Sequence, residues 1–126
     1  MLLFENETYR IIGACMKVHK TLGNGFLESV YQEAAEKAFS RDEIPFERHK
    51  KLKIQMGEIT LEKFFIADFI CFEKIILEIK AAQFIHKENI SQTINYLKAS
   101  GLPIGLLINF GKTSLQWKRL INTAPC

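Results

Sequence analysis

Charged residues lie inside two of the most apolar stretches of this 126-residue chain. Residues 61–72 contain Asp68, and residues 75–82 contain Glu78 and Lys80. Runs this apolar are typical of strands covered on both faces of a sheet, where an unpaired carboxylate or ammonium is costly. The fold must therefore pair these charges with one another or use them to hold a metal ion.

The remaining pattern predicts one mixed sheet flanked by helices, an α/β (α+β) fold in the order ααβββαββ. Gly23-Asn24-Gly25 and Gly101 are helix-ending signals. The apolar run 104–110 follows a helical crossover, which favours a strand parallel to its neighbour. Helices are predicted over residues 5–22, 26–40 and 87–100, and strands over 46–55, 61–72, 75–82, 104–110 and 114–121. No repeat or linker divides the chain, so we expect a single domain over residues 1–126.

Composition is that of an ordinary globular protein, with 48% apolar and 25% charged residues. The opening Met1-Leu2-Leu3-Phe4 meets Glu5 before a signal-like region forms, and no apolar run approaches the ~20 residues of a spanning helix. The three cysteines are odd in number and widely spaced. We therefore expect a cytoplasmic protein with no membrane segment, in which Cys15 and Cys71 are buried as small apolar residues and Cys126 lies in a frayed terminus.

A run of basic residues leaves two interpretations open. The net charge of +3 is mild, but five of the basic side chains fall within six residues: Arg48, His49, Lys50, Lys51 and Lys53. Such a run lines a phosphate path or forms the solvated face of an edge strand, and the sequence does not decide between them. Trp117 is expected in the core rather than on a base-stacking surface.

The geometry of the two charged strands depends on the turn between them. Glu78 and Lys80 are two residues apart and share a face of their strand. A two-residue turn at Glu73-Lys74 would place Asp68 opposite Ile79, so that the two carboxylates face apart. A three-residue loop over residues 72–74, or a bulge, places Asp68 opposite Glu78. We predict this second register.

Two converging carboxylates beside a lysine suit Mg²⁺, which prefers oxygen ligands and keeps several waters. The alternative is a surface ion pair between Glu78 and Lys80 with a solvated Asp68, an arrangement that is common and of little energetic weight. The chemistry alone leaves both interpretations open.

Asp68 followed by Glu78-Ile79-Lys80 on the next strand resembles the PD-(D/E)XK nuclease superfamily. The segment from Gly25 to Tyr31 is similar to the signature of the small bacterial GxxExxY proteins, which are placed in that superfamily. Residues 92–97 and 105–111 also resemble that family. The likeness thus spans nearly the whole chain. Ala67 departs from the pattern, since many members have proline before the aspartate.

The resemblance implies a role for each matching residue. Asp68 and Glu78 would be metal ligands, with the Ile79 carbonyl as a third, and Lys80 the catalytic lysine. Glu28 would be an acid near the metal, although a first-turn glutamate that favours the helix dipole is an equal alternative. Gln92 and Tyr96, four apart on one helical face, resemble a QxxxY element that approaches the active site, and the alternative is an ordinary polar helix face.

The function that the resemblance implies is Mg²⁺-dependent hydrolysis of nucleic acid by a metal-activated water, with Mn²⁺ as a substitute and DNA as the expected substrate. A homodimer would help to cut two strands. The alternative is a noncatalytic nucleic-acid or protein-binding module that keeps the nuclease fold.

Overall fold

The computed structural model describes residues 3–123 and contains the eight predicted elements in the predicted order. Their bounds are α1 (Glu5–Leu22), α2 (Glu28–Arg41), β1 (Phe46–Met56), β2 (Ile59–Cys71), β3 (Ile75–Lys80), α3 (Lys87–Ser100), β4 (Ile104–Asn109) and β5 (Gln116–Ile121). Two helices, α1 and α3, have the predicted bounds, and the strands match theirs within a few residues.

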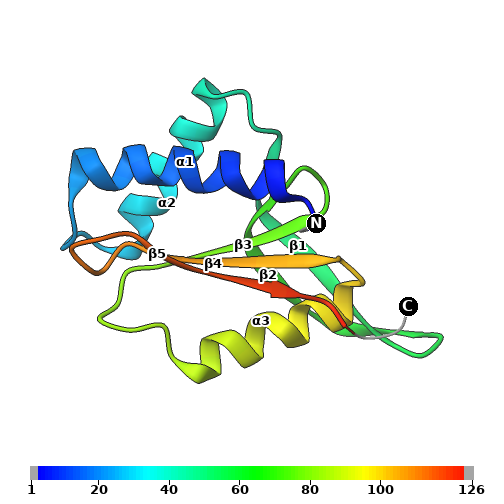
Figure 1. Ribbon diagram of the computed structural model, residues 1–126. Helices are drawn as coiled ribbons and strands as arrows, with labels where there is room; N and C mark the ends of the chain where they lie inside the picture. The colour runs from blue at the N-terminus through cyan, green and yellow to red at the C-terminus, as the bar shows by residue number, and fades with distance from the viewer. Residues whose placement is uncertain (1–2, 124–126) are drawn as a thin grey trace.

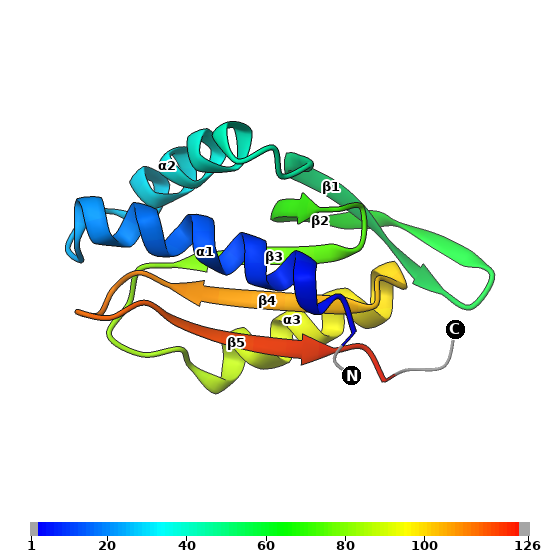
Figure 2. The ribbon, with the colours of Figure 1, turned by 45° about the horizontal axis from the view of Figure 1, so that its top comes forward.

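The five strands form one mixed sheet in the order β1-β2-β3-β4-β5. Neighbours are antiparallel except β3 and β4, which are parallel and joined through α3. Figure 1 shows the sheet between two helical layers, with α1 and α2 on one side and α3 on the other. Figure 2 shows α1 and α2 lying across the first of these faces. The structure confirms the α/β (α+β) mixed sheet and the parallel crossover.

Two apolar cores explain why the central strands are apolar on both faces. The larger core fills the space under α1 and α2 and includes Tyr31, Phe39 and Phe69. The smaller core lies under α3 and includes Phe65 and Leu97. Both β3 and β4 contribute side chains to each core, so nearly all of their residues are buried.

Helix α2 begins two residues later than predicted. Gly25 has a φ of +113° and Leu27 is extended, so the chain is still a loop at the position where the apolar pattern suggests a helix. Trp117 corrects a second expectation, because its side chain is 43% exposed rather than in the core. The reason is its position on β5, which forms an edge of the sheet.

Cysteine burial agrees with the sequence analysis. Cys15 and Cys71 are free thiols buried in the core under α1 and α2, and burial raises the pKa of each. Cys126 lies outside the described residues. Within residues 3–123, no helix combines the length and apolar character needed to cross a bilayer.

Candidate functional site

The loop between β2 and β3 sets the register of the candidate site. Cys71 pairs with Ile75 and Phe69 with Leu77, so three residues form the connection. Phe72 and Glu73 in this loop have φ values of 54° and 61°. Continuing the register by one residue places Asp68 opposite Glu78. The predicted odd register is therefore confirmed.

Asp68 lies at the point where β2 stops pairing with β3. At the same point, the side chains of β2 change from one face of the sheet to the other. Residues two apart in a strand normally share a face, yet Phe69 belongs to the core under α1 and α2 while Ala67 belongs to the core under α3. Opposite Asp68 on β1, His49 has a φ of 53°, which is strained for a residue other than glycine. Ladder pairing with β3 ends at Phe69. The Asp68 carboxylate instead accepts a hydrogen bond from the Ile79 N–H at 2.8 Å.

Glu78 is a buried carboxyl group beside this aspartate. Its side chain is on the α3 side of β3, and the residue is only 6% exposed. The Asp68 N–H donates to Glu78 Oε2 at 3.4 Å. Burial, and then the charge and hydrogen bond of Asp68, raise the pKa of Glu78 to about 8. Glu78 therefore holds its proton to a higher pH than an exposed glutamate does.

Lys80 and Glu28 complete the charged group from two different elements. Lys80 is two residues after Glu78 on β3, and its charge opposes the rise in the pKa of Glu78. Glu28 is in the first turn of α2. Partial burial raises the pKa of Glu28, Lys80 opposes that rise, and Asp68 adds to it. The Glu28 carboxyl group is therefore within electrostatic reach of Lys80 and Asp68.

The predicted residues on α3 differ in their relation to the carboxylates. Tyr96 is half-buried, with its ring stacked on Phe65 at a centroid distance of 3.8 Å. Burial, followed by the charges of Glu78 and Asp68, raises the pKa of its hydroxyl. Gln92 lies one turn earlier and is exposed. Within the described part of the chain, no hydrogen bond joins Gln92 to the carboxylates.

A structural role accounts for the tyrosine of the Gly25–Tyr31 segment. Tyr31 is fully buried, donates from its hydroxyl to the Gly23 carbonyl at 2.5 Å and accepts from the Phe26 N–H at 3.2 Å. Its ring stacks on Phe110 at 4.6 Å. Tyr31 thus fixes the loop that precedes Glu28 to the end of β4.

Sequence reasoning missed the residues that support the end of β3. The Asn109 amide accepts from the Ala82 N–H at 3.0 Å and donates to the Ala82 carbonyl at 2.9 Å. A Cβ on Gly111 would lie 2.2 Å from that carbonyl oxygen, so only glycine fits there. Asn109 and Gly111 fall inside a segment that resembles the family, and that resemblance was the available signal.

The oxygen atoms around Asp68 are suited to a divalent cation. The N–H and C=O of one strand residue point to the same side of the strand. Because the Ile79 N–H points to Asp68, the Ile79 carbonyl is directed toward that edge as well. Residues 3–123 contain no group of three or more His, Cys, Asp or Glu side chains placed to hold a metal. Two carboxylates and a carbonyl fit Mg²⁺ or Mn²⁺, which take hard oxygen ligands and keep waters, better than they fit Zn²⁺.

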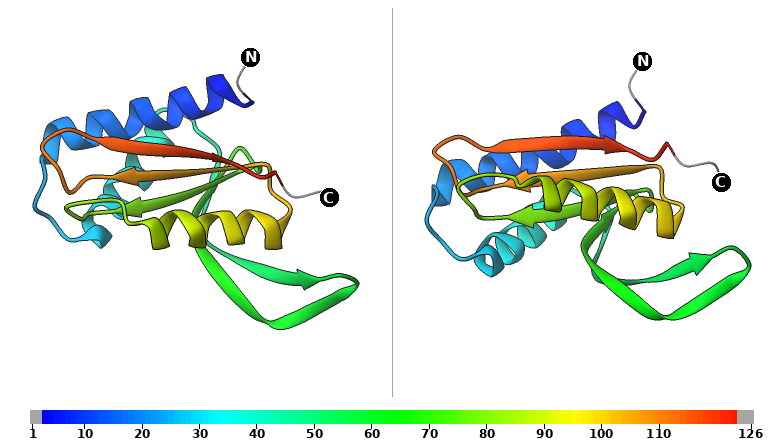
Figure 3. Two further views of the ribbon diagram at one scale, coloured as in Figure 1. Left: turned by 60° about the horizontal axis from the view of Figure 1, so that its bottom comes forward. Right: turned by 90° about the horizontal axis from the view of Figure 1, so that it is seen from below.

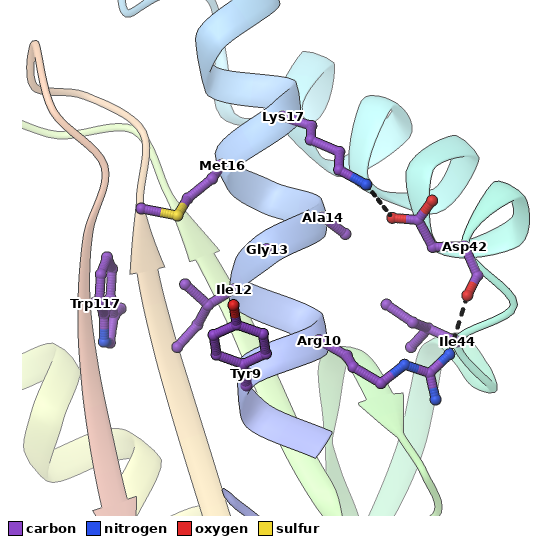
Figure 4. A pocket seen from close by; sticks show the side chains of 10 residues that line it. All are labelled: Tyr9, Arg10, Ile12, Gly13, Ala14, Met16, Lys17, Asp42, Ile44 and Trp117. Atoms are coloured by element: carbon purple, nitrogen blue, oxygen red, sulfur yellow. Dashed lines mark hydrogen bonds and ion pairs between the residues drawn. The ribbon is translucent and has the colours of Figure 1, made fainter. Parts of the chain in front are cut away.

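A separate cavity lies away from the predicted site residues. This cavity has a volume of about 510 Å³. Figure 4 shows the side chains that line it, which come from α1, the end of α2 and β5. Its wall includes Met16 and Trp117, and the Lys17–Asp42 ion pair of 3.4 Å lies at its rim. None of the residues that line it belongs to the predicted site. Asp68 and Glu78 are the stronger candidate for a functional site, because a buried acid with a raised pKa lies beside a second carboxyl group.

The comparison with protein families identifies the fold. A family model described as the PD-(D/E)XK nuclease superfamily matches residues 5–120. The chain belongs to this superfamily. Within the PD-(D/E)XK domain, Asp68 and the Glu78-Ile79-Lys80 segment stand on adjacent strands, where the sequence resemblance expects them.

A solved structure supports the assignment of the fold. The crystal structure of SSO0001 is similar to this PD-(D/E)XK domain with a TM-score of 0.60 and 16% sequence identity. The match covers 97% of this chain and 61% of that chain, so the domain spans about three-fifths of the longer protein. At this identity the likeness concerns the fold alone. No curated protein matches the sequence.

Proposed function

We propose that this domain is a Mg²⁺-dependent nuclease of the GxxExxY type that hydrolyses phosphodiester bonds, with DNA as its substrate. The observation that carries the proposal is the juxtaposition of Asp68 and Glu78 where β2 and β3 separate, with the Ile79 N–H bound to Asp68 at 2.8 Å. An isolated acid at this depth would be expensive to bury. A cation bound between two acids would compensate their charge, and metal binding would then explain why the acids are buried.

Asp68, Glu78 and the Ile79 carbonyl would hold the ion, which supplies a water of lowered pKa and neutralises phosphate charge. Lys80 shares the face of Glu78, so its ammonium can donate to a phosphate oxygen or orient the attacking water. The positive charge of Lys80 favours the ionised form of Glu28, so the two groups would act together on a bound phosphate. Tyr96 and Gln92 approach from α3, where their hydroxyl and amide groups can bind the substrate backbone.

The test is cleavage of single- and double-stranded DNA and RNA in Mg²⁺ or Mn²⁺ by wild type and Lys80→Ala. Lys98→Ala is the matched control, because Lys98 is exposed on α3 outside the predicted site. Metal-dependent cleavage that Lys80→Ala reduces at least a hundredfold, and Lys98→Ala leaves unchanged, is the expected result. Equal cleavage by Lys80→Ala and wild type would overturn the proposed role of Lys80 and point to a contaminating nuclease.

A noncatalytic binding module is the second candidate function. One observation favours it: within residues 3–123, no group of three or more His, Cys, Asp or Glu side chains is placed to hold a metal ion. Binding of nucleic acid that is unchanged by Mg²⁺, with no cleavage of any substrate, would favour this function over hydrolysis.

A further inference from the structure

The outer halves of β1 and β2 form an arm that projects beyond the other strands. Figure 3 shows this hairpin, residues 50–67, extending away from the body of the sheet. One of its faces is occupied: Leu52, Ile54 and Phe65 pack in the core under α3. The other face, which we call the outer arm face, includes Lys51, Lys53, Phe64 and Ile66, with the exposed Glu62 two residues before Phe64.

The outer arm face combines exposed apolar side chains with cations. Lys53 is paired with Phe64 and Lys51 with Ile66, so two lysines on β1 face two apolar side chains on β2. Phe64 is 45% exposed and Ile66 is 53% exposed. The Lys51 ammonium lies 4.3 Å from the centroid of the Phe64 ring. In residues 3–123, neither Lys51 nor Lys53 forms an ion pair with an acid.

This face begins beside the candidate site. Ile66 is two residues before Asp68, about 7 Å along an extended strand. On the paired strand, Lys51 is two residues after His49, whose Nε2 lies 3.4 Å from the Gln32 amide oxygen. Gln32 is one helical turn after Glu28 on α2. The outer arm face therefore begins within two residues of Asp68 on β2 and of His49 on β1, next to the change of face at Asp68.

We propose that the outer arm face binds a single-stranded segment of nucleic acid and leads it to the carboxylates. The unpaired ammonium groups of Lys51 and Lys53 complement backbone phosphates. The exposed ring of Phe64 can stack on a base, and bases are available for stacking only where they are not paired in a duplex. The inference rests on the proposed function for what happens at the carboxylates, but the binding itself does not require cleavage.

The experiment measures binding of a labelled single-stranded oligonucleotide and of its duplex by fluorescence anisotropy, in EDTA so that no metal-dependent cleavage occurs. Two variants test the arm. One is the double variant Lys51→Ala/Lys53→Ala, and the other is the single variant Phe64→Ala. Trp117→Ala with Lys118→Ala is the matched control, because it removes an aromatic ring of nearly equal exposure, 43%, and a lysine from the opposite edge of the sheet. Circular dichroism verifies that each variant is folded.

The expected result separates charge from stacking. The double lysine variant should lower the slope of log affinity against log salt by about 1.4, since each phosphate on a single strand contributes about 0.7. Phe64→Ala should weaken single-strand binding about tenfold with an unchanged salt slope. The control variant should bind like wild type, and duplex should bind more weakly than the single strand.

Three outcomes would overturn the inference. The first is wild-type affinity in both arm variants, and the second is an equal loss in the Trp117 and Lys118 control. The third is a wild-type dimer that the arm variants convert to monomers without a change in nucleic-acid affinity per monomer, which would assign the face to a second copy of the chain. A wrong assignment of nuclease activity can be told apart from a wrong assignment of the binding face. If only the nuclease activity is wrong, Lys80→Ala changes nothing in a cleavage assay, while the arm variants still lose binding in EDTA.

Discussion

Glu78 is a buried carboxyl group whose nearest charged neighbour is a second carboxyl group. Burial and the charge of Asp68 raise its pKa from 4.5 to about 8. Between these values the unfolded chain has released the proton that the folded protein retains, so stability falls as pH rises. We expect metal-free protein to lose up to about 1.4 kcal/mol per pH unit in this window, a loss that Glu78→Gln removes. Urea unfolding from pH 5 to 8 measures it, and parallel curves for the two proteins would contradict the assignment.

Tyr31 acts on the candidate site through the loop before α2. Its hydroxyl is bonded to both Gly23 and Phe26. Tyr31→Phe leaves these two backbone groups without the hydroxyl, and we expect a loss of about 1–3 kcal/mol in the free energy of unfolding. If the loop positions Glu28, cleavage by the folded variant should fall as well. Tyr9→Phe is the control, because Tyr9 is an exposed residue of α1. A Tyr31→Phe protein as stable as this control would show that the two bonds carry no net stability.

At the scale of elements, the helical spacing of apolar residues and the glycines that end helices were sufficient to predict the bounds of α1 and α3. Gly23 ends α1, and Gly101 ends α3. The register of β2 and β3 followed from a chemical requirement, that Asp68 and Glu78 face one another. The change of face between Phe69 and Ala67 could not be predicted, because the positive φ of His49 has no local sequence signal. Nor could the stack of Tyr96 on Phe65, which depends on how α3 crosses the sheet.

The ends of β3 and β4 meet where Gly111 packs against Ala82, and this contact can be tested by substitution. Gly111→Ala would place a Cβ 2.2 Å from the Ala82 carbonyl oxygen, a backbone atom that cannot move without disturbing the segment after Lys80. We expect a loss of about 3 kcal/mol or more in the free energy of unfolding. Gly13→Ala is the matched control: no atom lies within 4 Å of its added Cβ, and the α1 interior should gain about 0.5–1 kcal/mol.

If Gly111→Ala were as stable as wild type, the close packing of this glycine against Ala82 would not hold in solution. Chemical unfolding of both glycine variants provides the comparison.

For the molecule as a whole, a cation bound by Asp68 and Glu78 should raise the stability of the folded protein. Mg²⁺ or Mn²⁺ that binds only the folded protein stabilises it by about 2.7 kcal/mol at a hundred times its Kd. For a chain of this length, that corresponds to a rise in Tm of roughly 10 °C. Because the cation must displace the proton held by Glu78, the rise should be larger at pH 8 than at pH 6.

Asp68→Asn distinguishes this linkage from nonspecific effects of salt. The asparagine oxygen can still accept from the Ile79 N–H, so the variant should fold, yet it has lost a charged ligand and its Tm should no longer respond to Mg²⁺. Glu33→Gln, which removes an exposed carboxylate from α2, should respond like wild type. Thermal unfolding of the three proteins at both pH values, with calcium-free buffer and EDTA as the baseline, decides the matter. An equal rise in all three would place the cation elsewhere, and Asp68 and Glu78 would then be a structural contact between β2 and β3.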